Sequence, residues 1–258
     1  MPAPAGTQAV DRASTLLLAV LEAPRSVAFS DLVATTGLPK STVSRLLTSL
    51  ERHGLVQRAS DSSVRPGPAL TRFAMTAKSD RLVRLARPHM DRIADVTGET
   101  VNLAVPTPSA VEQIAQVDSR HLLGAVNWVG RPVPFHCSAL GKVFLAHGAS
   151  EAPRGRLERR TERTLTSRVD LAQDLARVRR LGYAVADSEL EPGLVAVAAP
   201  VRDAEGTVIA ALSVSGPAVR LTPQSIPGVG RLLAQETQAL SNELQARQNS
   251  RSRRAGAA

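Results

Sequence analysis

The sequence of 258 residues predicts an α+β fold in two parts: an N-terminal winged helix-turn-helix domain, and a larger C-terminal α/β domain joined to it by a helical linker. Three observations predict this fold. Apolar residues recur at helical spacing through the first third of the chain. Beyond it, apolar runs of strand length alternate with helical segments. The chain is also long enough for two ordinary domains, with 43% hydrophobic residues to build their cores.

The N-terminal segment predicts two helices ahead of a tight turn. Four apolar residues are expected on one face of the first helix: Val10, Ala13, Leu17 and Leu21. Pro24 should end this helix, and Ser30 should cap a short second helix over DLVATT. Gly37 then permits a sharp turn into a third helix. Helix, turn and helix follow one another at the spacing of a helix-turn-helix.

Residues 37–56, GLPKSTVSRLLTSLERHGLV, predict the third helix from about Pro39 to His53, with Gly54 as its left-handed stop. Its buried stripe is predicted to be Val43, Leu46, Leu47 and Leu50. Its start is polar and consists of Lys40, Ser41, Thr42, Ser44 and Arg45. Small hydroxyls and cations at the positive end of a helix dipole suit phosphates and base edges. We therefore expect double-stranded DNA here, with Arg45 reading guanine; the alternative is a solvated helix face.

The following segment GLVQRASDSSVRPG predicts a two-stranded wing. Leu55 to Arg58 forms the first strand, SDSS at 60–63 the turn, and Val64 with Arg65 a return strand that the next two prolines cut off. Arg58 and Arg65 are expected to contact phosphate or a minor groove. Residues 8–68 are therefore predicted to form the DNA-binding domain.

A connecting helix over residues 69–80 is predicted to lead into the C-terminal domain, residues 81–246. A second helix carries apolar residues up to a stop at Gly98, and Pro88 within it predicts a kink or a break. Strands are predicted over TVNLAV, VEQIAQV, LVAVAA and VIAALSVSG, with helices from Ser138 and from 170–181. A last helix should run from Pro223 to about Gln245, leaving 247–258 as a disordered basic tail. This layout predicts a mainly antiparallel sheet that can hold a small molecule.

Composition narrows the functional classes. Lys and Arg number 32 against 23 Asp and Glu, which favours a polyanionic partner. The single cysteine, Cys137, excludes an intramolecular disulfide and a cysteine-built zinc site, and the five histidines show no metal-ligand spacing. No cofactor or metal is expected. Without a basic leader or an apolar stretch of about 18 to 20 residues, the protein is expected to be cytoplasmic and nucleoid-associated, with no membrane partner.

Three blocks behind the winged N-terminus carry a resemblance to IclR-family transcriptional regulators: GRPVPFHCSALGKVFLA at 130–146, GYAVADSELEPGLVAVAAPV at 182–201 and GTVIAALSVSGP at 206–217. The resemblance implies a homodimer or dimer of dimers, a roughly palindromic operator, and a small, usually carboxylate-bearing effector in a GAF/profilin-like C-terminal domain. The wing departs from the family, since Val64-Arg65-Pro66-Gly67 replaces an aromatic residue followed by arginine, leucine and glycine. Aromatic residues make up only 2%, so a pocket of stacked rings is not expected.

The stretch FHCSALGKVFLA turns from an extended segment into a helix at Ser138, so the N–H groups of Ala139 and Leu140 should be free to bind a carboxylate. Ser213 and Ser215 lie two residues apart and should project from the same sheet face; their alternative role is bonding to neighbouring backbone. The resemblance implies that five positions line the ligand cavity: Ala139, Leu140, Asp187, Ser213 and Ser215. Ser138 and Cys137 complete the predicted effector site, and Asp187 has an alternative role as a cap of its own turn.

Two other classes of function are alternatives. Cys137 at a helix start, beside His136, fits a nucleophile of a small-molecule enzyme acting on an acid, or a redox sensor. Adjacent residues of an extended segment point opposite ways, however, so a small buried cysteine is favoured and no catalytic residue is predicted. Lys142 is expected on the helix surface or at its cap, and Asp187, Glu189 and Glu191 in an exposed loop at the pocket mouth. An effector-responsive transcription regulator, not an enzyme, is the function that the sequence predicts.

Overall fold

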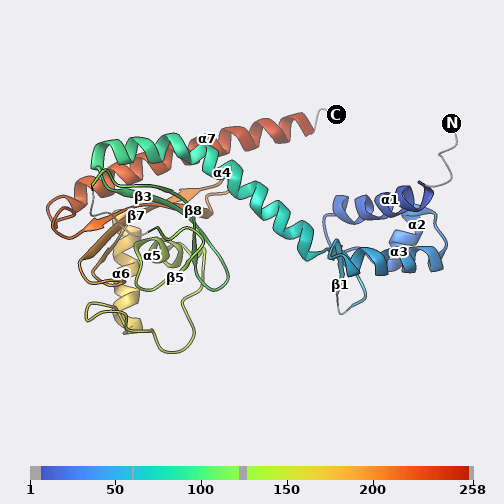
Figure 1. Ribbon diagram of the computed structural model, residues 1–258, viewed down its shortest axis with the longest axis horizontal. Coiled ribbons are helices and arrows are strands. Elements are labelled where there is room, and N and C mark those ends of the chain that lie inside the picture. The colour runs from blue at the N-terminus through green and yellow to red at the C-terminus, as the bar shows by residue number, and fades with distance from the viewer. Residues whose placement is uncertain (1–6, 60, 122–126, 256–258) are drawn as a thin grey trace. The chain divides into compact units, whose positions relative to one another are not determined.

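The structure is a computed structural model that describes residues 7–59, 61–121 and 127–255 (Figure 1). The chain divides into two compact units between Asp80 and Arg81. The first unit is mainly helical, and the second is built on a six-stranded sheet. The predicted α+β class, with an N-terminal helix-turn-helix and a C-terminal α/β unit, is confirmed.

The N-terminal unit packs three helices and a small wing around one core. Its helices are α1 (Gln8–Glu22), α2 (Phe29–Thr36) and α3 (Lys40–Arg52). The core contains eight buried side chains: Leu16, Val20, Leu32, Val43, Leu47, Leu50, Val56 and Val64. Gly37 (φ 63°) ends α2 and Gly54 (φ 68°) follows α3, both in the left-handed conformation that the sequence predicts.

Two details of the first helices differ from prediction. The buried face of α1 carries Leu16 and Val20, whereas Val10 is 63% exposed and Leu21 is 43% exposed. The run TLLLAVL places apolar residues on several faces, so periodicity alone does not select the buried one. Ser30 does not cap α2, because the helix begins at Phe29 after Ala28 and Ser30 lies within its first turn.

The wing consists of β1 (Val56–Arg58) and β2 (Val64–Pro66), paired antiparallel with Gln57 opposite Arg65. Ser60, part of the predicted turn, lies outside the described residues. Gly67 follows β2 and donates its N–H to Leu55 O at 2.9 Å. A Cβ atom at this position would collide with the backbone oxygen of Gly54, so the close approach of the two segments requires glycine.

Helix α4 (Pro68–Thr97) is continuous through Pro88, so the alternative of a break there is wrong. Proline removes one backbone hydrogen bond, but burial of Ala86, Met90 and Ile93 against the sheet holds this part of the helix in place. Gly98, with φ 68°, ends the helix as predicted.

The sheet of the second unit has the order β5-β4-β3-β8-β7-β6, and all neighbouring strands are antiparallel. Its strands are β3 (Thr100–Pro106), β4 (Val111–Val117), β5 (Pro132–Val133), β6 (Ala184–Asp187), β7 (Leu194–Arg202) and β8 (Val208–Pro217). The four longer strands were predicted. Strands β5 and β6 were not predicted, because they have only two and four residues and too few periods to give a pattern.

Helices cover both faces of this sheet (Figure 1). On one face lie α5 (Ala139–Ala146) and α6 (Arg168–Leu181), and on the other lie α4 and α7 (Ile226–Ala255). Helix α7 begins three residues after its predicted start and continues to Ala255, so the prediction of disorder from 247 is wrong. Alanine, glutamine and arginine favour helix there and extend it past the sheet. Residues 256–258 lie outside the described residues.

Candidate functional site

The first candidate site is the start of α3. Lys40, Ser41 and Arg45 are exposed there, and Thr42 and Ser44 are half-buried. The buried side chains of Val43, Leu47 and Leu50 anchor the opposite face of the helix in the core. The predicted polar cluster therefore forms one continuous surface at the positive end of the helix dipole.

The two predicted wing residues are both exposed but differ in their contacts. Arg58 on β1 forms an ion pair with Glu51 of α3, at 3.4 Å between Nε and Oε2. Arg65 on β2 projects into solvent opposite Gln57. Because an exposed ion pair contributes little, Arg58 can exchange Glu51 for another anion at small cost.

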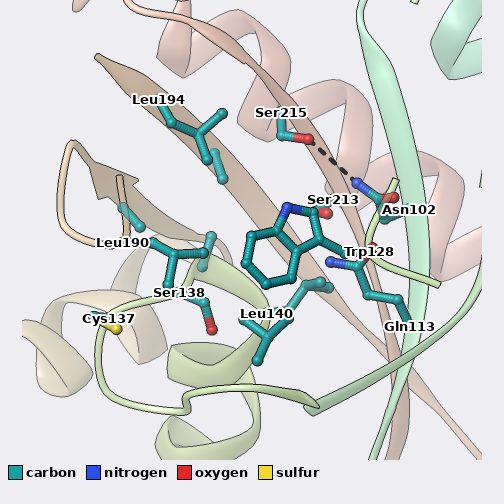
Figure 2. Close-up of a pocket in the computed structure, with 14 residues that line it drawn as sticks. Asn102, Gln113, Trp128, Cys137, Ser138, Leu140, Leu190, Leu194, Ser213 and Ser215 are labelled. Atoms are coloured by element: carbon teal, nitrogen blue, oxygen red, sulfur yellow. Dashed lines mark hydrogen bonds between the residues drawn. The ribbon is translucent and has the colours of Figure 1, made fainter. Parts of the chain in front are cut away.

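The second candidate site is a cavity of about 40 Å³ between the start of α5 and the sheet (Figure 2). Six predicted effector residues line it: Cys137, Ser138, Ala139, Leu140, Ser213 and Ser215. Small side chains on this sheet face, including Ala186 and Ala196, leave the space. None of the described residues that line the cavity carries a charge.

The start of α5 presents free backbone donors to this cavity. Ser138 caps the helix: its Oγ accepts from Gly141 N at 3.1 Å and donates to Pro134 O at 2.6 Å. Within the described residues, the N–H groups of Ala139 and Leu140 have no acceptor, as expected for the first turn of a helix. An anion in the cavity could receive both bonds and the favourable end of the helix dipole.

The sheet side of the cavity carries polar groups that were not among the predicted site residues. Asn102 lies opposite Ser213 in the register of β3 and β8, and its Nδ2 donates to Ser215 Oγ at 3.2 Å. Asn102 Oδ1 and Gln113 Oε1 are buried and have no hydrogen-bond partner among the described residues. The available signal was an amide within each of the predicted strands TVNLAV and VEQIAQV, where an apolar residue would otherwise be expected. Trp128, which is not among the predicted site residues, lines the same cavity (Figure 2).

Asp187 does not line this cavity, contrary to prediction. Ala186 of β6 points into it, and because neighbours on a strand alternate, Asp187 faces the other way, opposite Val195. Its carboxylate forms an ion pair with Arg163 at 2.8 Å and accepts from Ser188 Oγ at 3.0 Å. The alternative role of Asp187, as a structural cap of its own turn, fits these contacts.

Lys142 is 1% exposed, so the prediction of a surface or capping lysine is wrong. Its Nζ lies 2.6 Å from Glu189 Oε1 and 2.8 Å from Asp174 Oδ2, and it donates to Val185 O at 3.1 Å. Glu189 is buried as well, not part of an exposed loop, and its burial raises its pKa despite the opposing Lys142 ammonium. This ionic cluster joins α5, α6 and the end of β6 behind the cavity.

Cys137 lacks the chemistry of a nucleophile. Its side chain is fully buried, and burial together with the charge of Glu189 raises the pKa of the thiol to about 11. The neighbouring His136 is engaged elsewhere, with Nε2 2.9 Å from Glu158 O. The raised pKa contradicts the expected lowering at a helix start, because loss of solvent outweighs the helix dipole.

Neither a metal-binding cluster nor a membrane-spanning helix occurs in the part of the chain that the structure describes. No group of three or more histidine, cysteine, aspartate or glutamate side chains is placed to hold a metal ion. No helix there combines the length and the apolar character needed to cross a membrane.

A winged helix-turn-helix unit and a sheet unit with a cavity that has polar groups in its walls define the class of a DNA-binding regulator. Two family models match the chain: the IclR helix-turn-helix domain over residues 9–60, and the C-terminal domain of the bacterial transcriptional regulator IclR over residues 74–242. The chain belongs to the IclR family of transcriptional regulators.

Relatives match over nearly the whole chain. The transcriptional repressor IclR of Escherichia coli (strain K12) is 33% identical over 241 residues, which cover 90% of this chain and 88% of that protein. The regulator BhcR of Paracoccus denitrificans is 30% identical, covering 92% and 87%. Among solved structures, an IclR homologue from Microbacterium hydrocarbonoxydans complexed with 4-hydroxybenzoate is 26% identical, with a TM-score of 0.60 and coverage of 93% and 100%.

Proposed function

We propose that this regulator binds a roughly palindromic operator as a dimer or dimer of dimers. Its affinity for the operator decreases or increases when it binds a small carboxylate. The single observation that carries the sensing role is the cavity at the start of α5, where backbone donors with no acceptor among the described residues meet buried polar groups. In this proposal residues 8–68 bind DNA, 69–80 link, and 81–246 sense the effector. The protein works in the cytoplasm, at the nucleoid.

The polar start of α3 supports the DNA-binding role of individual residues. A helix-turn-helix inserts the first half of its second helix into the major groove, which would bring Lys40, Ser41 and Arg45 to the bases and phosphates. A guanidinium can bond two acceptors of guanine, so Arg45 is the proposed specificity residue. Thr42 and Ser44 are half-buried and suit phosphate contacts, and Arg58 and Arg65 would hold the backbone or minor groove from the wing.

The effector site is proposed to be the cavity lined by Cys137, Ser138 and the α5 start. A carboxylate would accept from Ala139 and Leu140 N–H, and Ser213 and Ser215 would bind from the sheet. The relative crystallised with 4-hydroxybenzoate, a hydroxylated carboxylate, supports this class of ligand. Binding would shift the population between states that differ in operator affinity.

An enzymatic or redox function through Cys137 has less support. The buried thiol has a raised pKa, and the relatives are named regulators and repressors. A turnover assay on small acids with Cys137→Ala tests that alternative: product formation that is lost in the variant would favour the enzyme.

Two experiments test the proposed function. Selection of duplexes from a random pool by the full chain should enrich inverted repeats, and enrichment of no common sequence would contradict it. A thermal-shift screen against keto, hydroxy and aromatic carboxylates should identify a ligand, since saturation to a hundred times Kd stabilises by about 2.7 kcal/mol. The Ser213→Ala/Ser215→Ala variant should lose that shift; an unchanged shift would place the ligand elsewhere.

A further inference from the structure

The sheet wall of the cavity carries a patch of amides and hydroxyls in an otherwise apolar interior. The patch consists of Asn102, Gln113, Ser213 and Ser215, which are between 2% and 7% exposed. Gln113 pairs with Ala104, two residues along β3 from Asn102, so the two amides lie on the same face of neighbouring strands. The fully buried Val101, Leu103, Leu212 and Val214 alternate with the polar positions and pack on the opposite face.

Two oxygens of this patch have unsatisfied hydrogen-bonding capacity. Asn102 Nδ2 donates a hydrogen bond to Ser215 Oγ (Figure 2). The Oδ1 atom of Asn102 is buried and has no partner among the described residues. Gln113 Oε1 is likewise buried and unpaired there. An amide oxygen kept from water without a donor destabilises the fold by about 1 to 3 kcal/mol. Two such groups beside one cavity point to a ligand that brings a donor.

The chemistry of the walls limits that ligand. One end of the cavity offers backbone N–H groups at the start of α5, which suit a single carboxylate. No charged side chain of the described lining could neutralise a second carboxylate. A keto oxygen can only accept, so it would face the two amide oxygens without bonding them. A hydroxyl donates to an amide oxygen and accepts from a serine, and it fits either orientation of the amides.

Size narrows the class further. The cavity measures about 40 Å³, a few times the roughly 10 to 15 Å³ that one water requires. The bulky side chains of Trp128 and Leu140 are part of its lining, so an aromatic acid would have to displace a side chain. A short aliphatic acid would require less displacement of the lining side chains.

We infer that Asn102 and Gln113 form a hydroxyl-reading subsite, and that the effector is a short hydroxycarboxylic acid with one carboxylate. This inference rests on the proposed effector-sensing function and adds the group that determines specificity. The carboxylate binds at the start of α5, and the hydroxyl donates to one of the two amide oxygens while accepting from a serine.

The test is calorimetric titration of the full chain with a matched series: lactate as either enantiomer, pyruvate and propionate. These acids share a carbon skeleton and differ only in a hydroxyl, a keto group or no oxygen at that carbon. One enantiomer of lactate should bind at least about tenfold more tightly than pyruvate and propionate. Gln113→Met and Asn102→Leu should reduce that preference to about twofold or less while leaving propionate binding in place.

Gln116→Met is the matched control. Gln116 also lies on β4, opposite Asn102 in the β3–β4 register, and its buried amide oxygen has no hydrogen-bond partner among the described residues, but it is outside the cavity lining. It should keep the full preference for lactate, which separates reading of the hydroxyl from general damage to the strand. Equal loss of preference in Gln116→Met would overturn the assignment, as would equal affinity of wild type for lactate and propionate.

Different results would contradict the hydroxyl-reading subsite and the carboxylate-sensing function. Preferred binding of pyruvate, or of 4-hydroxybenzoate over lactate, would overturn the hydroxyl or short-chain assignment but leave carboxylate sensing intact. Absence of binding by every acid in the series and by 4-hydroxybenzoate would overturn both.

Discussion

The ammonium of Lys142 lies 2.6 Å from Glu189 Oε1 in the interior of the C-terminal unit. Lys142 is on α5, one turn beyond Ala139 and Leu140, and Glu189 precedes Leu190, which lines the cavity. The ion pair therefore links α5 to the segment that carries Leu190, and both contribute residues to the lining of the proposed effector site. Asp174 Oδ2 of α6 also lies 2.8 Å from this ammonium, so one buried cation faces two carboxylates.

Lys142→Met should destabilise the C-terminal unit by about 3 to 5 kcal/mol, because it leaves two carboxylates without their buried cation. Urea unfolding measures this difference. The control is Arg87→Ala, which removes an exposed i,i+4 pair with Asp91 and should change stability by no more than about 0.5 kcal/mol. Equal stability of Lys142→Met and wild type would refute the structural role of the cluster.

Cys137 should resist alkylation in the native protein. With its pKa raised to about 11, the thiol stays protonated at about pH 8, where an ordinary cysteine is partly ionised. Reaction with iodoacetamide, followed by mass spectrometry, should be slow in buffer and fast in concentrated guanidinium. Its native rate should increase as the pH approaches 11. Rapid native labelling at about pH 8 would revive the redox alternative.

Gly67→Ala should destabilise the N-terminal unit, because its Cβ would overlap the backbone of Gly54 and Leu55, which cannot move as a flexible side chain does. We expect a loss of at least about 1 kcal/mol, measured by thermal unfolding. Gly228→Ala provides the contrast: its Cβ meets open space on α7, and alanine should stabilise that helix by about 0.5 to 1 kcal/mol. Similar effects of the two substitutions would contradict the predicted collision.

Arg45→Ala should reduce discrimination between the selected operator and unrelated DNA by about 1 to 3 kcal/mol. Arg52→Ala is the matched control, since this exposed arginine lies in the last turn of the same helix. Anisotropy titrations with operator and competitor duplexes measure both. If Arg45→Ala keeps the full discrimination, another residue reads the bases.

Local chemistry was the most predictable part of this fold. Gly54 and Gly98 adopt left-handed conformations where the sequence predicts helix stops, and Gly37 does so where it predicts a sharp turn. Ser138 begins α5 as predicted, because capping depends on neighbouring residues alone. Predicting the direction of the Asp187 side chain requires knowing that it lies on strand β6, and this strand is too short to show an alternating pattern in the sequence.

Non-local pairing accounts for the other errors. In the helix sequence ALGKVFLA, Lys142 indicates only a polar position. Its buried partners Asp174 and Glu189 lie 32 and 47 residues further along the chain. Asn102 and Gln113 become a site only when the sheet aligns β3 with β4 and β8. Their amides carried a local signal, polarity within strands, but nothing local showed that both face one cavity.

The most direct test of effector control is the affinity of the full chain for its selected operator, measured by anisotropy with and without the best-binding acid. Wild type should change affinity by at least about fivefold at saturation, the lower range of allosteric coupling. Ser213→Ala/Ser215→Ala should bind DNA as before and show no such change. If wild type binds the acid yet its operator affinity stays the same, the cavity does not control DNA binding.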